Sequence, residues 1–195
     1  CVDKPNPAGY YAAYFLHEVK TQKEIDGFIG QVHKSIRSMK QHYATLEATC
    51  VLQENALEAR IGLMRCHYLL DETEQALAYA NVVIDDSQTP EDIAATARYW
   101  RGKIKFEAKD YAAATPDLEK VAALGGTRGA ESQFMLCQIA FASGDYAATE
   151  QALFEFIQAY ANYDAWKHQA FLLLVDTYIA LEDWFQARAT AESIL

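Results

Sequence analysis

The sequence Gly144-Asp145-Tyr146-Ala147-Ala148 predicts a sharp turn between two helices. An aspartate at such a turn caps the second helix, because its carboxylate accepts a hydrogen bond from a free backbone N–H group. The pattern recurs at residues 109–114 (Lys-Asp-Tyr-Ala-Ala-Ala) and 182–187 (Glu-Asp-Trp-Phe-Gln-Ala), and an altered copy lies at 71–76 (Asp-Glu-Thr-Glu-Gln-Ala). The turn therefore organises a large part of the chain.

The acidic residues of the four turns are regularly spaced. From Glu72 to Asp110 is 38 residues, from Asp110 to Asp145 is 35, and from Asp145 to Asp183 is 38. A period in the mid-thirties with this turn predicts an array of helical repeats, each of which buries its apolar face only against its neighbours.

Two further positions recur around the turns. An aromatic residue directly after the acid is large enough to pack between neighbouring helix pairs; it is Tyr111, Tyr146 or Trp184. A small residue a few positions later allows two helices to cross closely. It is Ala76, Ala114 or Ala187, with Thr149 in the third copy.

These features resemble the tetratricopeptide repeat (TPR) family over roughly residues 56–195. The signature of the family's first helix is partly present. Tyr178 matches its tyrosine, Gly102 its glycine, and Leu136 and Leu174 its leucine. Arg101 stands at the leucine position of the second copy. The resemblance implies an all-α fold, a right-handed superhelical array of antiparallel helix pairs (an α-solenoid) with about ten helices.

The whole chain, 1–195, is predicted to be a single array. Residues 1–53 form a diverged leading helix pair, and the repeats cover 54–88, 89–126, 127–161 and 162–195. Apolar spacing and turn signals predict these helices: 7–19, 24–48, 54–70, 74–84, 90–108, 111–123, 130–142, 146–160, 163–181, and one from 184 onward. Residues 124–129 (Leu-Gly-Gly-Thr-Arg-Gly) are expected to be a loop between repeats.

Composition excludes several classes of partner. The net charge is −10. This charge argues against nucleic acid, since phosphate binding needs a basic patch, and against binding to anionic membranes. No apolar run has the length that a bilayer requires, so no direct insertion into a membrane is expected.

The sequence contains no recognisable catalytic or metal-binding pattern. It lacks a phosphate-binding Gly-Lys loop, a nucleophile elbow and a His-Glu-x-x-His zinc motif. The four cysteines have neither disulfide nor zinc-ligand spacing, and Cys66 and Cys137 fit core positions. We expect a protein that is not an enzyme and that holds no cofactor and no metal.

Helical phase predicts a binding groove along the first helices of the repeats. Two largely apolar columns flank a polar column in which Arg65 and Lys103 are positioned to hold carboxylates. The alternative interpretation is that the aromatic residues pack between helices and that the polar column is only solvated. The candidate binding residues are Ile61, Arg65, Tyr68, Tyr99, Lys103, Phe106, Phe134, Gln138, Phe141 and Asp176.

The expected function is a scaffold that binds a peptide or protein segment in the concave groove. Two alternatives stay open: an accessory protein with a small-molecule or glycan pocket, and a structural spacer. The repeat style is similar to that of long multi-repeat TPR proteins of Gram-negative cell envelopes. That similarity implies a segment of a longer protein in the periplasm or at the outer membrane, with a cytoplasmic location still open. Cys1 is interpreted as a fragment boundary, with a lipid-bearing terminal cysteine as the alternative.

Overall fold

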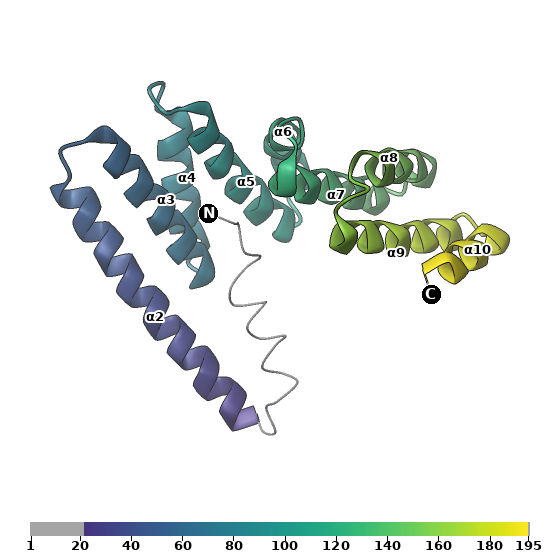
Figure 1. Ribbon diagram of the computed structural model, residues 1–195, viewed down its shortest axis with the longest axis horizontal. Helices are drawn as coiled ribbons and strands as arrows, with labels where there is room; N and C mark the ends of the chain where they lie inside the picture. The colour runs from purple at the N-terminus through teal and green to yellow at the C-terminus, as the bar shows by residue number, and fades with distance from the viewer. Residues whose placement is uncertain (1–21, 195) are drawn as a thin grey trace. The chain divides into compact units, whose positions relative to one another are not determined.

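The computed structural model describes residues 22–194, and this part of the chain is helical without strands (Figure 1). Its nine helices, where about ten were predicted, are α2 (Gln22–Thr49), α3 (Gln53–Leu69), α4 (Thr73–Asp85), α5 (Glu91–Glu107), α6 (Tyr111–Ala122), α7 (Gly126–Ala142), α8 (Tyr146–Ala159), α9 (Asp164–Ala180) and α10 (Trp184–Ile194). The helix predicted over 7–19 lies outside the described residues. The all-α fold class is confirmed.

The described chain divides within α5 into two compact units, one up to Ile104 and one from Lys105 onward. The single continuous array therefore stays a prediction. In the first unit α3 packs against both α2 and α4. In the second, contacts link α6 to α7, α7 to α8, α8 to α9 and α9 to α10.

The predicted aspartate caps are present. Asp110 accepts a hydrogen bond from the backbone N–H of Ala113, and Asp145 accepts one from Ala148. Asp183 likewise accepts from the N–H of Gln186 at 3.0 Å. These bonds satisfy N–H groups that the first turn of a helix leaves without a partner. The three well-preserved copies of the turn thus begin their second helices in the same way.

The residue before the acid adopts a left-handed backbone conformation in all four turns. Its φ angle is 59° at Asp71, 61° at Lys109, 81° at Gly144 and 59° at Glu182. This conformation ends the first helix and reverses the chain within three residues. Only glycine adopts it without steric cost, so three of the four turns hold a residue that is strained there.

The predicted loop over 124–129 is too long, because α7 begins at Gly126. Gly125 precedes the helix with φ 68° and ψ −158°, a region that only glycine occupies readily. The chain therefore turns at Gly125 and Gly126 and is helical from there. Gly129, the third glycine of this stretch, is buried in α7 and packs close to the backbone carbonyl groups of Val121 and Ala122.

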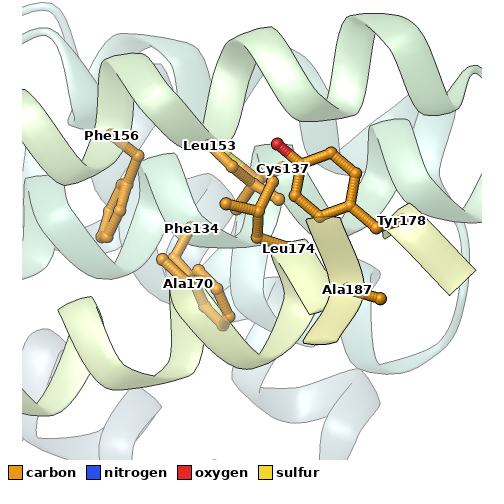
Figure 2. Close-up of a cluster of buried hydrophobic side chains, with 8 residues drawn as sticks. All are labelled: Phe134, Cys137, Leu153, Phe156, Ala170, Leu174, Tyr178 and Ala187. Atoms are coloured by element: carbon orange, nitrogen blue, oxygen red, sulfur yellow. The ribbon is translucent and has the colours of Figure 1, made fainter. Parts of the chain in front are cut away.

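The two units contain the same packing arrangement. In the second unit the core is built from Phe134 and Cys137 of α7, Leu153 and Phe156 of α8, Ala170, Leu174 and Tyr178 of α9, and Ala187 of α10 (Figure 2). In the first unit it is built from Ile61 and Met64 of α3, Ala80 and Val83 of α4, and Ala97 of α5. The five members of the first core occupy the same positions relative to their turn acids as five members of the second.

The predicted small residues at helix crossings are buried. The exposed fraction is 0% for Ala76, Ala114 and Thr149 and 5% for Ala187. A larger side chain at these sites has no room, because protein cores are close-packed.

Candidate functional site

The basic side chains of the first unit differ in whether they have acidic partners. Lys40 pairs with Glu72 at 2.7 Å, Arg60 with Glu47 at 3.0 Å, and Arg98 with Glu91 at 2.7 Å. Arg65 is half-buried on α3, and among the described residues its guanidinium group has no carboxylate partner. Its charge is therefore not neutralised within this part of the chain.

Two nitrogen donors of this unit are buried without an acceptor among the described residues: Nε of Arg65 and Nε1 of Trp100. A buried donor that makes no hydrogen bond costs about 1–3 kcal/mol. Such donors in a native protein call for an explanation, and a bound ligand with acceptor oxygens is one.

The indole ring that carries the Trp100 donor contacts two tyrosine rings. The rings of Tyr68 on α3 and Trp100 on α5 are 4.8 Å apart, and the Tyr99 ring meets Trp100 edge-on at 5.3 Å. Arg65 precedes Tyr68 by three residues and therefore lies on the same face of α3. The Tyr68–Trp100 contact thus links the α3 face that bears Arg65 to α5.

Lys103 lies one turn after Trp100 on α5. Its Nζ is 3.4 Å from the hydroxyl group of Tyr99, 5.7 Å from the centre of the Tyr99 ring and 6.0 Å from that of Trp100. A cation at these distances is held by the electrons of the rings. We call the side chains of Arg65, Tyr68, Trp100 and Lys103 the α3–α5 face. It combines two positive charges with aromatic surface.

The structure places three of the predicted groove residues inside the packing instead. The exposed fraction is 6% for Ile61 and 5% for Tyr99 and Phe134. Ile61 and Phe134 belong to the two cores, and the Phe134 ring contacts Phe156 and Trp166, each at 5.8 Å. Their burial assigns these side chains to packing, so they are not part of the α3–α5 face.

The remaining predicted residues belong to the second unit. Phe106 is half-buried against Tyr111 with ring centres 5.7 Å apart, and Phe141 against Tyr146 at 5.3 Å. Gln138 is half-buried and Asp176 is exposed. These residues provide no basic group, so the positive part of the candidate site lies in the first unit.

Sequence reasoning did not select Trp100. Its signal was present, since Trp100 lies one helical turn before Lys103 and both side chains therefore share a face. Comparison of equivalent positions in the repeats did not indicate Trp100, because the equivalent residue on α3 is Gly62, which is not aromatic.

The role of Glu72 was also missed. Its side chain does not cap α4 but accepts hydrogen bonds from Lys40 of α2 at 2.7 and 2.9 Å, and it also contacts His67. The bonds from Lys40 hold the pKa of Glu72 below its usual value, with a smaller contribution from His67. This cluster joins α2 to the turn between α3 and α4.

The buried thiols of the described residues are poorly suited to act as nucleophiles. Burial raises the pKa of the Cys137 thiol to about 12 and also raises that of Cys66, so both thiols stay protonated at neutral pH. Within residues 22–194, no three His, Cys, Asp or Glu side chains come together as a metal site. Nor does any helix in that range have the length and apolar character needed to cross a membrane.

A hollow on the surface of α8 is lined by six residues of that one helix: Ala147, Glu150, Gln151, Phe154, Glu155 and Gln158. A small-molecule site typically draws its walls from several elements and encloses most of its ligand. The hollow on α8 does neither.

Comparison with known proteins does not place the chain in a family. No protein-family model matches it, and no curated protein matches it either.

Proposed function

We propose that this chain is a non-enzymatic scaffold that binds an acidic segment of another protein on the α3–α5 face. The proposal includes a TPR-like organisation, in which the helix pairs form a right-handed superhelical array. The recurrent turn and the repeated core arrangement support that organisation.

The observation that carries the binding proposal is the pair of buried donors, Nε of Arg65 and Nε1 of Trp100, which have no acceptor among the described residues. A carboxylate supplies acceptor oxygens to such donors and a negative charge to Arg65. Hydrogen bonds to charged groups contribute about 1.5–3 kcal/mol, more than neutral ones. An acidic side chain or a chain terminus is the ligand group that matches.

The aromatic rings favour a peptide over an isolated anion. Tyr68 and Trp100 offer apolar area beside the charges, and such aromatic residues are enriched where proteins contact one another. A peptide that places an apolar side chain on these rings and a carboxylate near Arg65 uses both features. An inorganic anion uses only the charge.

Selection from a random peptide library displayed on phage tests this function. We expect the protein to enrich peptides that combine Asp or Glu with an apolar residue. The double variant Arg65→Glu with Lys103→Glu should lose this enrichment while it keeps its helical circular dichroism spectrum. Both side chains are only partly buried, so the charge reversal should leave the fold intact.

A matched control is Arg188→Glu, which reverses an exposed charge on α10, in the second unit. It should leave the selected peptides unchanged. If no peptide is enriched, the chain acts as a spacer and the proposed function is wrong. If the double variant enriches the same peptides, they bind elsewhere and the α3–α5 face is not the binding site.

A further inference from the structure

Contacts between α2 and α3 show which residues of the two helices lie level with each other. Arg60 of α3 donates a hydrogen bond from Nε to the carboxylate of Glu47 on α2, at 3.0 Å. The ring of Tyr43 on α2 lies directly against Gly62 of α3, where a Cβ atom would be 2.5 Å from the ring. Residue numbers therefore fall along α2 as they rise along α3, and the two helices run antiparallel (Figure 1).

Arg65 lies on α3 between the side that contacts α2 and the side that contacts α5. Gly62 meets α2, and the Tyr68 ring meets Trp100 of α5. Arg65 stands halfway between Gly62 and Tyr68 in the sequence. Each step of three residues moves a side chain by about 60° around the helix axis. The Arg65 side chain therefore extends from α3 between its two neighbours, α2 and α5.

Met39 of α2 lies level with Arg65 and on the same side of the helix pair. It precedes Tyr43 by about one turn, whereas Arg65 follows Gly62, the contact of that ring, by about one turn. Because the helices are antiparallel, these two displacements have the same direction. Lys40, the next residue, points instead toward the start of α4. Met39 is 46% exposed, so it presents apolar surface beside the charge of Arg65.

The charges around Met39 suit the same acidic ligand. Between Asp26 and Glu47 the sequence of α2 has no Asp or Glu, so the surface near Met39 does not repel a carboxylate. On α3, Glu58 is exposed on the same face two turns before Arg65. That negative charge favours a ligand carboxylate at the Arg65 end of α3, which is level with Met39, over one nearer the start of the helix.

We propose that Met39 is a specificity-determining residue for the acidic segment, and that this segment carries an apolar residue on each side of its carboxylate. The proposal rests on the proposed function, since it takes the carboxylate to be bound at Arg65. One apolar side chain of the segment then contacts Tyr68 and Trp100, and the other contacts Met39. The site thus extends from the α3–α5 face onto α2.

The spacing within the ligand follows from the geometry of an extended chain. Side chains two positions apart lie on the same face of such a chain, which advances about 7 Å over two residues. Neighbouring helix axes lie about 8–10 Å apart, a distance that this advance and the length of a side chain together span. The ligand class is therefore an extended segment with the sequence apolar-x-acidic-x-apolar, in which x is any residue.

Two peptides test the role of Met39. The two-sided peptide is Ser-Leu-Ser-Glu-Ser-Leu-Ser and the one-sided peptide is Ser-Leu-Ser-Glu-Ser-Ser-Ser, both acetylated and amidated so that glutamate is their only charge. Titrations followed by nitrogen–proton correlation NMR give the dissociation constants. We expect the native protein to bind the two-sided peptide at least about fivefold more tightly, because its second leucine leaves water on Met39. Met39→Gln keeps the length of the side chain but not its apolar character, and should bind the two peptides within about twofold of each other.

The control Val82→Gln changes a side chain on α4 whose exposed fraction is 49%, close to that of Met39, and it should keep the preference. Neither side chain is buried, so both variants should keep the native thermal midpoint. Equal binding of the two peptides by the native protein, or a preference that survives Met39→Gln, overturns the role of Met39 and leaves the proposed function intact. If the native protein binds neither peptide, the proposed function fails and the role of Met39 fails with it.

Discussion

The hydroxyl group of Tyr178 on α9 donates a hydrogen bond of 2.8 Å to the carboxylate of Glu150 on α8. The Tyr178 ring is 5% exposed and belongs to the core of the second unit. Tyr178→Phe removes the donor and leaves a half-buried carboxylate without this bond. We expect a loss of about 1–3 kcal/mol in the free energy of unfolding, measured by urea denaturation. Tyr146→Phe, at a half-buried ring that contacts Phe141, is the control and should cost less than about 0.5 kcal/mol.

Tyr178 should also make the folded protein less stable at alkaline pH. Burial, together with the bond to Glu150, raises the pKa of Tyr178 from 10.0 to about 12, and burial raises that of Cys137 from 9.0 to about 12. Between these values the unfolded chain releases both protons while the folded chain keeps them, so stability falls as the pH rises. Thermal midpoints should decline from about pH 9 to pH 12. The combined variant Tyr178→Phe with Cys137→Ala should decline less steeply, and an equally steep decline contradicts the assignment.

At acidic pH, protonation of Glu72 should weaken the contact between α2 and the turn that follows α3. Because Lys40 lowers the pKa of Glu72, its contribution to stability is present above its ordinary pKa of 4.5 and is lost as the pH falls through the lower folded value. Glu72→Gln should therefore speed hydrogen exchange in α2 at pH 7 and reduce the further loss on acidification. Glu74→Gln, at an exposed neighbour, should change neither. Unchanged exchange in α2 of the Glu72 variant contradicts a docking role for this cluster.

The left-handed turn positions predict opposite effects for two substitutions. Lys109 has a φ angle of 61°, and Gly144 has one of 81°. Lys109→Gly relieves strain and should raise stability by up to about 1 kcal/mol, whereas Gly144→Ala introduces it and should cost roughly 1–2 kcal/mol. Ala112→Gly, in the first turn of α6, is the control and should destabilise by about 0.5–1 kcal/mol. If both turn variants shift the denaturation midpoint in the same direction, backbone strain at Lys109 is contradicted.

Overpacking tests the predicted helix crossings. Ala114 is 0% exposed, whereas Ala112 on the same helix is exposed. Ala114→Trp should cost roughly 1–3 kcal/mol or more because the core around it has no free volume. Ala112→Trp should change the thermal midpoint little. Equal midpoints for the two variants contradict the assignment of Ala114 to a close crossing.

The sequence was informative where a signal is local. An aspartate before a helix caps it through its own backbone neighbourhood, so Asp110 and Asp145 could be assigned without tertiary structure. Apolar spacing located the described helices for the same reason. The start of α7 was misplaced because Gly125 and Gly126 are typical of loops, and their spacing does not show where the helix resumes.

Contacts between distant segments were less predictable. Helical phase puts Ile61 and Phe134 on one face of their helices, but it does not tell whether a neighbouring helix covers that face. Glu72 follows the turn pattern, yet Lys40 on another helix attracts its carboxylate away from the cap. The pairing of Tyr68 with Trp100 likewise depends on how α3 and α5 pack, which no local pattern contains.

The binding proposal depends on the donors of Arg65 and Trp100, and their N–H groups give separate signals in a nitrogen–proton correlation NMR spectrum. A probe is the acetylated peptide Glu-Phe-Glu-Glu-Leu-Glu, with Gln-Phe-Gln-Gln-Leu-Gln as its uncharged match. We expect the acidic peptide to shift the signals of Arg65 Nε–H and Trp100 Nε1–H in the native protein, and the uncharged peptide to leave them in place. In the double variant Arg65→Glu with Lys103→Glu, the acidic peptide should no longer shift the Trp100 signal. Signals that stay in place, or that move equally with both peptides, contradict it.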